Sequence, residues 1–174
     1  PSSASAQTNL TSEGGLLFDI QSSYDGSLSD GGGDAYDGCY QFVVNGMQYN
    51  SSGMATPPTT LDGRQVEMPE ITMAGMLAVR RLIYVPSTGG DYARYLDVVT
   101  NNSAASATIT MGLTCNLGSD GSESIFSTGS GDTSCTPDDA YCNSDDVEAG
   151  ADPSLGHVFQ GTTPTTRVTT VSLG

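Results

Sequence analysis

The chain has 174 residues, of which 20 are acidic, five are arginine and none is lysine, so its formal net charge is −15. Such a charge repels nucleic-acid phosphates and anionic lipid, and no apolar run is long enough to insert into a membrane, so neither partner is expected. With 22 glycines, 8 prolines and only 36% hydrophobic residues, the composition favours short strands joined by turns over helices.

The first third of the chain predicts two strand regions separated by a long loop. Residues 1–14 are small and polar, and we expect an ordered N-terminal extension. The apolar run 15–21 predicts a strand, and the Gly/Asp/Ser segment 22–38 predicts a loop too polar to pack. Residues 40–49 contain two apolar runs on either side of Asn45-Gly46, which is the strongest hairpin signal in the chain.

The middle of the chain predicts a second hairpin. Its strands are expected at 64–72 and 76–85, with the turn at Ala74-Gly75. Arg80 and Arg81 are adjacent in the second strand and therefore lie on opposite faces. We expect one of these two arginines to meet a carboxylate inside the protein or across an interface.

A third hairpin is predicted from two strands at 92–100 and 105–115, joined by residues 101–104. The second of these strands alternates clearly between apolar and polar residues, as a half-buried strand does. Its expected buried face consists of Ala107, Ile109, Met111, Leu113 and Cys115.

The last third is again rich in Gly, Ser and Asp, with short strands expected at 123–127, 155–160 and 166–173. Many short strands with regular turns predict an antiparallel β-sandwich, with a jelly roll as the close variant. We expect one sandwich domain over residues 15–164, followed by a C-terminal strand over 165–174 that lies at a sheet edge or pairs with another chain.

The four cysteines indicate disulfide bonds rather than a metal site, because there is no CxxC pair and His157 is the single histidine. Three pairings are possible. The short separation of Cys135 and Cys142 favours a local bridge, which leaves Cys39 with Cys115. Disulfides imply an oxidising compartment, so we expect an extracellular or cell-surface protein. The first residue is a proline, which agrees with a removed secretion signal.

Two kinds of ligand site are predicted in polar loops. Carboxylates on a glycine-rich loop suit calcium, although the spacing departs from an EF-hand; the candidate ligands are Asp25, Asp30, Asp34 and Asp37. Three N-x-S/T sequons predict glycosylation at Asn9, Asn50 and Asn101.

No catalytic residue is assigned, and an enzyme is not expected. His157 could act as a base with Ser154, but no Gly-x-Ser-x-Gly elbow surrounds any serine. Acid pairs such as Glu67 and Glu70 could serve glycoside hydrolysis only at a separation that a sequence does not define. The chain has no tryptophan, so a sugar-stacking surface would have to come from tyrosines.

Several phrases resemble those of an uncharacterised family of secreted bacterial β-rich domains found in cell-surface proteins. The resemblance spans residues 34–159 and is carried by DAYDG (34–38), LDGR (61–64), YVP (84–86), YARYL (92–96), NLGSD (116–120) and DPSLGHVF (152–159). It implies location and architecture rather than a chemical activity.

These features predict a structural subunit of an extracellular filament or surface layer. We expect head-to-tail homopolymers in which one terminal segment, 1–11 or 166–173, adds as a strand to the sheet edge of the next copy. The alternative is a calcium-dependent carbohydrate-binding or adhesion module, with surface glycans as partners.

Overall fold

The structure is a computed structural model that describes residues 7–30, 35–117, 123–146 and 152–171. These residues form thirteen strands and no helix, so the predicted all-β class is confirmed. No described helix is therefore available to cross a membrane. The chain consists of two compact units, residues 1–116 and 117–174, where the sequence analysis expected a single domain over 15–164.

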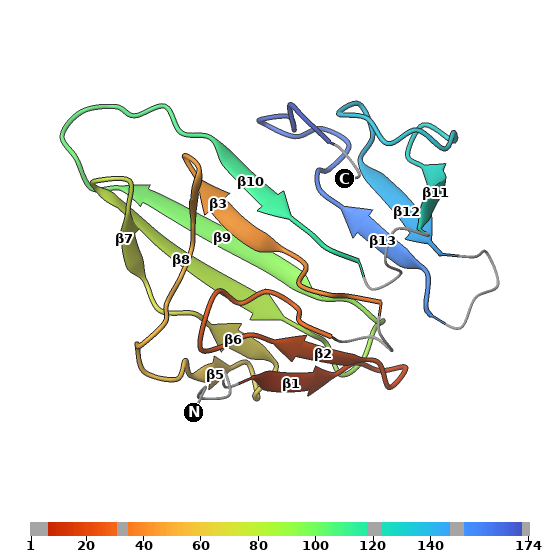
Figure 1. Cartoon of the computed structure of the whole chain (residues 1–174), viewed down its shortest axis with the longest axis horizontal. Coiled ribbons are helices and arrows are strands. Elements are labelled where there is room, and N and C mark those ends of the chain that lie inside the picture. The colour runs from red at the N-terminus through yellow and green to blue at the C-terminus, as the bar shows by residue number, and fades with distance from the viewer. Residues whose placement is uncertain (1–6, 31–34, 118–122, 147–151, 172–174) are drawn as a thin grey trace. The chain divides into compact units, whose positions relative to one another are not determined.

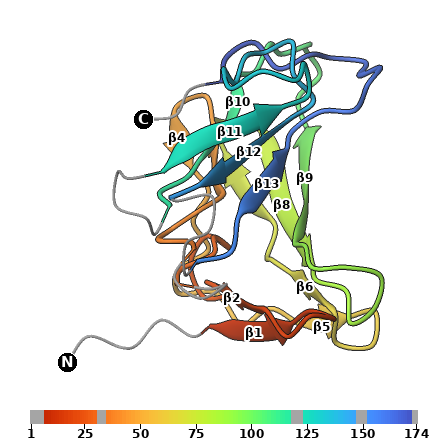
Figure 2. The ribbon, with the colours of Figure 1, turned by 90° about the vertical axis from the view of Figure 1, so that its right-hand side faces the viewer.

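The first unit begins with a hairpin that the sequence analysis did not predict. Strand β1 (Thr8–Thr11) pairs antiparallel with β2 (Leu17–Ile20), so that Thr8 faces Ile20 and Thr11 faces Leu17. Figure 2 shows the two strands side by side at one end of the unit. We call Thr8–Ile20 the N-terminal hairpin. Residues 8–11 were expected in an ordered N-terminal extension, and they form a strand that pairs with their own chain.

The hairpin predicted around Asn45-Gly46 is confirmed. Strand β3 (Gln41–Val44) turns directly into β4 (Met47–Gln48), with Val44 opposite Met47. Asn45 and Gly46 both have positive φ, 49° and 76°, which a tight two-residue hairpin turn requires and which these two residue types tolerate best.

The largest sheet of the first unit is built on β8 (Leu77–Tyr84), as Figure 1 shows. One edge of β8 pairs with β9 (Arg94–Asn101) over all eight residues. Its other edge pairs with β6 (Gln65–Glu67) and β7 (Ile71–Met73), and β5 (Thr59–Thr60) extends the sheet beyond β6. The turn predicted at Ala74-Gly75 joins β7 to β8, with φ of 44° and 95°.

Two strand predictions in this region are wrong. The single strand expected over 64–72 is interrupted after Glu67, because Pro69 has no N–H to continue the ladder, and β6 and β7 pair with different halves of β8. The hairpin expected at 92–115 does not form. Strand β10 is limited to Met111–Thr114 and pairs with β3 instead of β9.

The predicted burial of residues 105–115 is also wrong. Met111 is 56% exposed, Leu113 is 49% exposed, and Cys115 is exposed as well. Only residues 111–114 of this segment form a strand, and both of its faces are exposed, so the alternation did not indicate a buried face. The core instead collects side chains from many short segments, and its fully buried members include Ile20, Leu28, Val44, Val66, Val79 and Ile83.

The second unit contains one three-stranded antiparallel sheet in the order β11-β12-β13. Its strands are Ser124–Thr128, Tyr141–Asp145 and Leu155–Val158, close to the two strands expected at 123–127 and 155–160. The strand expected at 166–173 is absent over the described residues 166–171, and residues 172–174 lie outside the described part of the chain.

Both predicted disulfides are confirmed. Cys39 bonds to Cys115 within the first unit, and Cys135 bonds to Cys142 within the second. Two disulfides fit an oxidising environment outside the cytosol.

Candidate functional site

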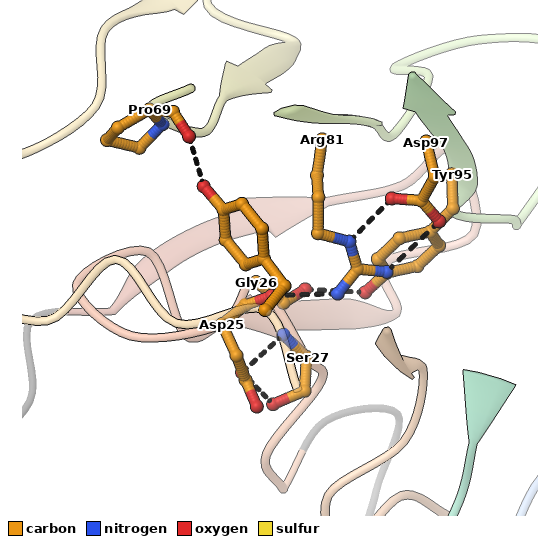
Figure 3. Close-up of polar contacts among 8 residues, drawn as sticks. Asp25, Gly26, Ser27, Pro69, Arg81, Tyr95 and Asp97 are labelled. Atoms are coloured by element: carbon orange, nitrogen blue, oxygen red, sulfur yellow. Dashed lines mark hydrogen bonds and ion pairs between the residues drawn. The ribbon is translucent and has the colours of Figure 1, made fainter. Parts of the chain in front are cut away.

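The most concentrated polar chemistry in the first unit surrounds Arg81, whose side chain is fully buried. Its Nε lies 2.6 Å from Asp97 Oδ1, and its Nη2 lies 3.4 Å from Asp97 Oδ2. Its Nη1 donates a hydrogen bond of 2.7 Å to the carbonyl oxygen of Asp25 (Figure 3). The expectation that one of the paired arginines meets a carboxylate is therefore met by Arg81, while Arg80 on the opposite face is exposed.

Aromatic rings complete what we call the Arg81 cluster. The Arg81 guanidinium carbon lies 5.4 Å from the ring centre of Phe42 and 4.9 Å from that of Tyr95, within the range of cation–π attraction. The Tyr95 hydroxyl donates to the Gly26 carbonyl at 3.0 Å (Figure 3). Burial raises the pKa of Tyr95 well above its usual value, so this hydroxyl stays a neutral donor.

The electrostatics of the Arg81 cluster are those of a buried ion pair. Burial raises the pKa of Asp97 above its usual value, and the neighbouring Arg81 charge opposes this rise. Because Arg81 has no exposed surface, its donors serve the chain's own atoms and do not reach a ligand. The cluster thus fixes β8, β9 and the loop 25–26 to one another.

The predicted calcium loop is more deeply buried than the sequence suggested. Asp25 is 0% exposed, and its Oδ1 accepts hydrogen bonds from the Ser27 N–H and hydroxyl at 2.9 and 2.6 Å (Figure 3). Its Oδ2 accepts from Gln48 Nε2 at 2.8 Å. Leu28, in the same loop, is fully buried and bridges to Ile20 and Cys39. The expectation that this segment is too polar to pack is therefore wrong for residues 25–28.

The four candidate calcium ligands are not brought together by the described structure. Asp37 Oδ2 accepts from Asn116 Nδ2 at 2.9 Å, and Asp30 is exposed. Asp34 lies outside the described residues. Within the described ranges, no three side chains of His, Cys, Asp or Glu gather to hold a metal ion. Calcium binding by Asp25, Asp30, Asp34 and Asp37 stays a prediction.

All three sequon asparagines are exposed. Asn9 lies in β1, Asn50 follows β4, and Asn101 is the last residue of β9. The Asn101 carboxamide oxygen accepts from the Ser103 hydroxyl at 2.8 Å, so the two reactive positions of this sequon adjoin each other. Glycosylation at these sites stays a prediction.

Two carboxylates, those of Glu13 and Asp91, hold the turn of the N-terminal hairpin against residues 89–91. We call this pair the carboxylate clasp. Glu13 Oε2 accepts from the N–H groups of Gly89 and Gly90 at 2.6 and 3.1 Å. Asp91 Oδ1 accepts in return from the Ser12 hydroxyl at 2.5 Å and the Gly14 N–H at 2.6 Å. These two donors lower the pKa of Asp91. A side chain at Gly14 would clash with the Asp91 carboxylate, which explains the glycine.

In the second unit, His157 and Ser154 do not form the pair considered from the sequence. His157 Nε2 lies 3.0 Å from Ser144 Oγ, whereas the Ser154 hydroxyl donates to Asp145 Oδ2. Ser144 is only 1% exposed, so a substrate could not reach its hydroxyl. The contact instead ties β13 to β12.

Burial lowers the pKa of His157 below its usual value of 6.5. Because the unfolded imidazole takes up a proton at a higher pH than the folded one, we expect the second unit to lose stability as the pH falls below 6.5. The single histidine allows a direct check by NMR titration of its ring protons, and His157→Gln should flatten the pH dependence of unfolding above pH 5. A histidine that titrates at or above 6.5 would contradict this expectation.

Comparison of the chain with protein-family models, curated proteins and solved structures finds no match. The resemblance to secreted cell-surface domains therefore stays a prediction, and the functional argument rests on this chain's own residues.

Proposed function

We propose that the chain is a structural subunit of an extracellular filament or cell-surface layer, with its sheets arranged as a β-sandwich of jelly-roll type. The carrying observation is that segment 166–171 is predominantly β-branched yet has no strand partner among the described residues. Among the described residues, the only hydrogen bond of this segment runs from the Val168 N–H to Gln160 Oε1, at 3.1 Å. Such a segment has the composition of a strand and unpaired backbone groups to offer to another chain.

An acceptor for such a strand is available in the first unit. Strand β9 has eight residues and pairs with β8 alone among the described strands. A long edge strand without proline or lysine presents unpaired N–H and C=O groups that readily accept a further strand. Leu96 on this strand is 52% exposed and would be partly covered by the addition.

Contacts of the N-terminal hairpin favour 166–173 over 1–11 as the donor segment. Thr8–Thr11 already pairs with β2, and the carboxylate clasp holds the adjoining turn. Arg64 Nη2 also donates to the Thr11 carbonyl at 2.8 Å. Donation of residues 8–11 would break the pairing with β2 and the Arg64 hydrogen bond. Donation of 166–171 breaks one hydrogen bond and an exposed ion pair of 3.6 Å between Arg167 and Asp138.

The distribution of charge also favours residues 166–173 as the donor segment. Residues 153–174 contain no acidic side chain and one arginine, while the rest of the chain carries all 20 acids and four arginines. Copies of so acidic a protein repel one another, and a donor segment of the opposite sign lowers this repulsion where two copies meet.

We expect electron micrographs of the native protein to show regular fibres or sheets. The double variant Thr169→Pro/Thr170→Pro should abolish them, because one of two successive N–H groups must point toward the acceptor edge and proline has none. Thr169→Ala/Thr170→Ala retains both N–H groups and should still assemble. Dispersed monomers of the unaltered protein, or normal assembly of the proline variant, would refute strand addition by this segment.

A calcium-dependent adhesion module is the second proposal. It requires that chelation with EDTA lower the melting temperature and that calcium restore it. The internal hydrogen bonds of Asp25 and Asp37 leave this proposal with less support than the structural one.

A further inference from the structure

Three threonines surround Pro164 in a part of the second unit that has no strand. Thr162, Thr163 and Thr165 are all exposed. Their hydroxyl groups make no hydrogen bond within the described part of the chain. We call residues 161–165 the threonine linker.

The chain contains a second segment of nearly the same composition, and it is held quite differently. In TPPTT (56–60), Thr59 and Thr60 form β5, and Pro57 is buried. The Thr60 hydroxyl donates to Glu67 Oε1 at 2.8 Å and accepts from Gln65 Nε2 at 3.1 Å. Composition alone therefore does not distinguish the two segments, whereas the strand pairing of Thr59 and Thr60 and the hydroxyl bonds of Thr60 do.

Exposed, irregular backbone with a proline and free hydroxyl groups is what an enzyme that modifies threonine can bind and reach. Proline keeps the linker from forming a helix, and no sheet partner covers its backbone. Ser/Thr-rich segments with proline are typical of O-glycosylated stalks in extracellular proteins. We propose that Thr162, Thr163 and Thr165 carry O-linked glycans.

The reaction is a glycosyl transfer from a sugar activated as a phosphate ester, catalysed by a glycosyltransferase of the producing cell. The threonine Oγ1 forms a bond to the anomeric carbon of the sugar. The bond between that carbon and the phosphate oxygen breaks, and the phosphate leaves with the electron pair. The hydroxyl proton passes to a base of the transferase.

Glycans here would also serve the proposed assembly, although the modification does not depend on it. Bulky sugars next to Pro164 would favour an extended and solvated linker over the bent one. An extended linker would carry the donor segment 166–173 away from its own chain and toward the next copy.

Mass spectrometry of the protein purified from the cells that produce it tests the proposal. A protease that cuts before Asp152 releases residues 152–174, which contain no asparagine and so cannot carry an N-linked glycan. We expect this peptide to be heavier than its sequence by whole sugar residues, and fragmentation should locate them on Thr162, Thr163 or Thr165.

The triple variant Thr162→Ala/Thr163→Ala/Thr165→Ala should lose the added mass completely. The matched variant Thr56→Ala/Thr59→Ala should retain all of it. A peptide at its unmodified mass, or added mass that survives in the triple variant, would overturn the proposal. Either result is read from mass alone and is independent of whether fibres form.

Discussion

Replacing Arg81 with alanine is expected to destabilise the first unit by about 3–5 kcal/mol, the usual cost of leaving the partner of a buried ion pair uncompensated. The Asp97 side chain is 12% exposed and would retain no cation within the Arg81 cluster. The Asp25 carbonyl would lose its guanidinium donor as well. Urea denaturation followed by circular dichroism measures the change in the free energy of unfolding.

Arg80 provides a matched control, because it occupies the next position of the same strand with its side chain exposed. Arg80→Ala should change the stability by no more than about 0.5 kcal/mol. The double variant Arg81→Met/Asp97→Leu should be less destabilised than Arg81→Ala, since it removes both charges together. Equal effects of Arg80→Ala and Arg81→Ala would show that the ion pair does not hold β8 to β9.

Removal of the Cys39–Cys115 bridge is also expected to lower the stability of the first unit strongly. It joins cysteines 76 positions apart, whereas Cys135 and Cys142 are separated by seven. In the chain-entropy description, a longer closed loop restricts the unfolded state more, so the costs are about 4.5 kcal/mol for the first bridge and about 2.5 kcal/mol for the second.

The two bridges lie in different units, which makes the comparison sharper. Cys39→Ser/Cys115→Ser should lower the melting temperature of the first unit, and Cys135→Ser/Cys142→Ser that of the second. Scanning calorimetry of both variants measures these shifts separately. A larger loss of stability on removal of the short bridge would contradict the loop-length argument.

Local signals in the sequence were sufficient for much of this fold. Asn45-Gly46 and Ala74-Gly75 identified two turns because positive φ is a property of the residues themselves. The disulfide pairing followed from separation along the chain. Opposite faces for Arg80 and Arg81 followed from the two-residue period of a strand.

The failures concern contacts between distant segments. Strand β10 pairs with β3, more than 60 residues earlier, and nothing within residues 105–115 specifies that choice over β9. The burial of Asp25 depends on Ser27 and Gln48 donating to its carboxylate. The sequence showed an acidic, glycine-rich loop, and only the fold reveals that its carboxylate has donors within the chain. The carboxylate clasp was missed for the same reason. Glu13 and Asp91 each accept hydrogen bonds from residues that lie 76 or more positions away along the chain.

The Cys39–Cys115 bridge also determines how far the chain can be stretched. If the protein bears tension through its two ends, as a fibre subunit would, force passes across the bridge and bypasses the chain between the cysteines, which are 76 positions apart. At roughly 3.4 Å per extended residue, the bridge shortens the length to which the chain can be pulled by roughly 260 Å. The strands β3 to β10, which lie between the two cysteines, are then shielded from mechanical unfolding for as long as the bridge stays oxidised.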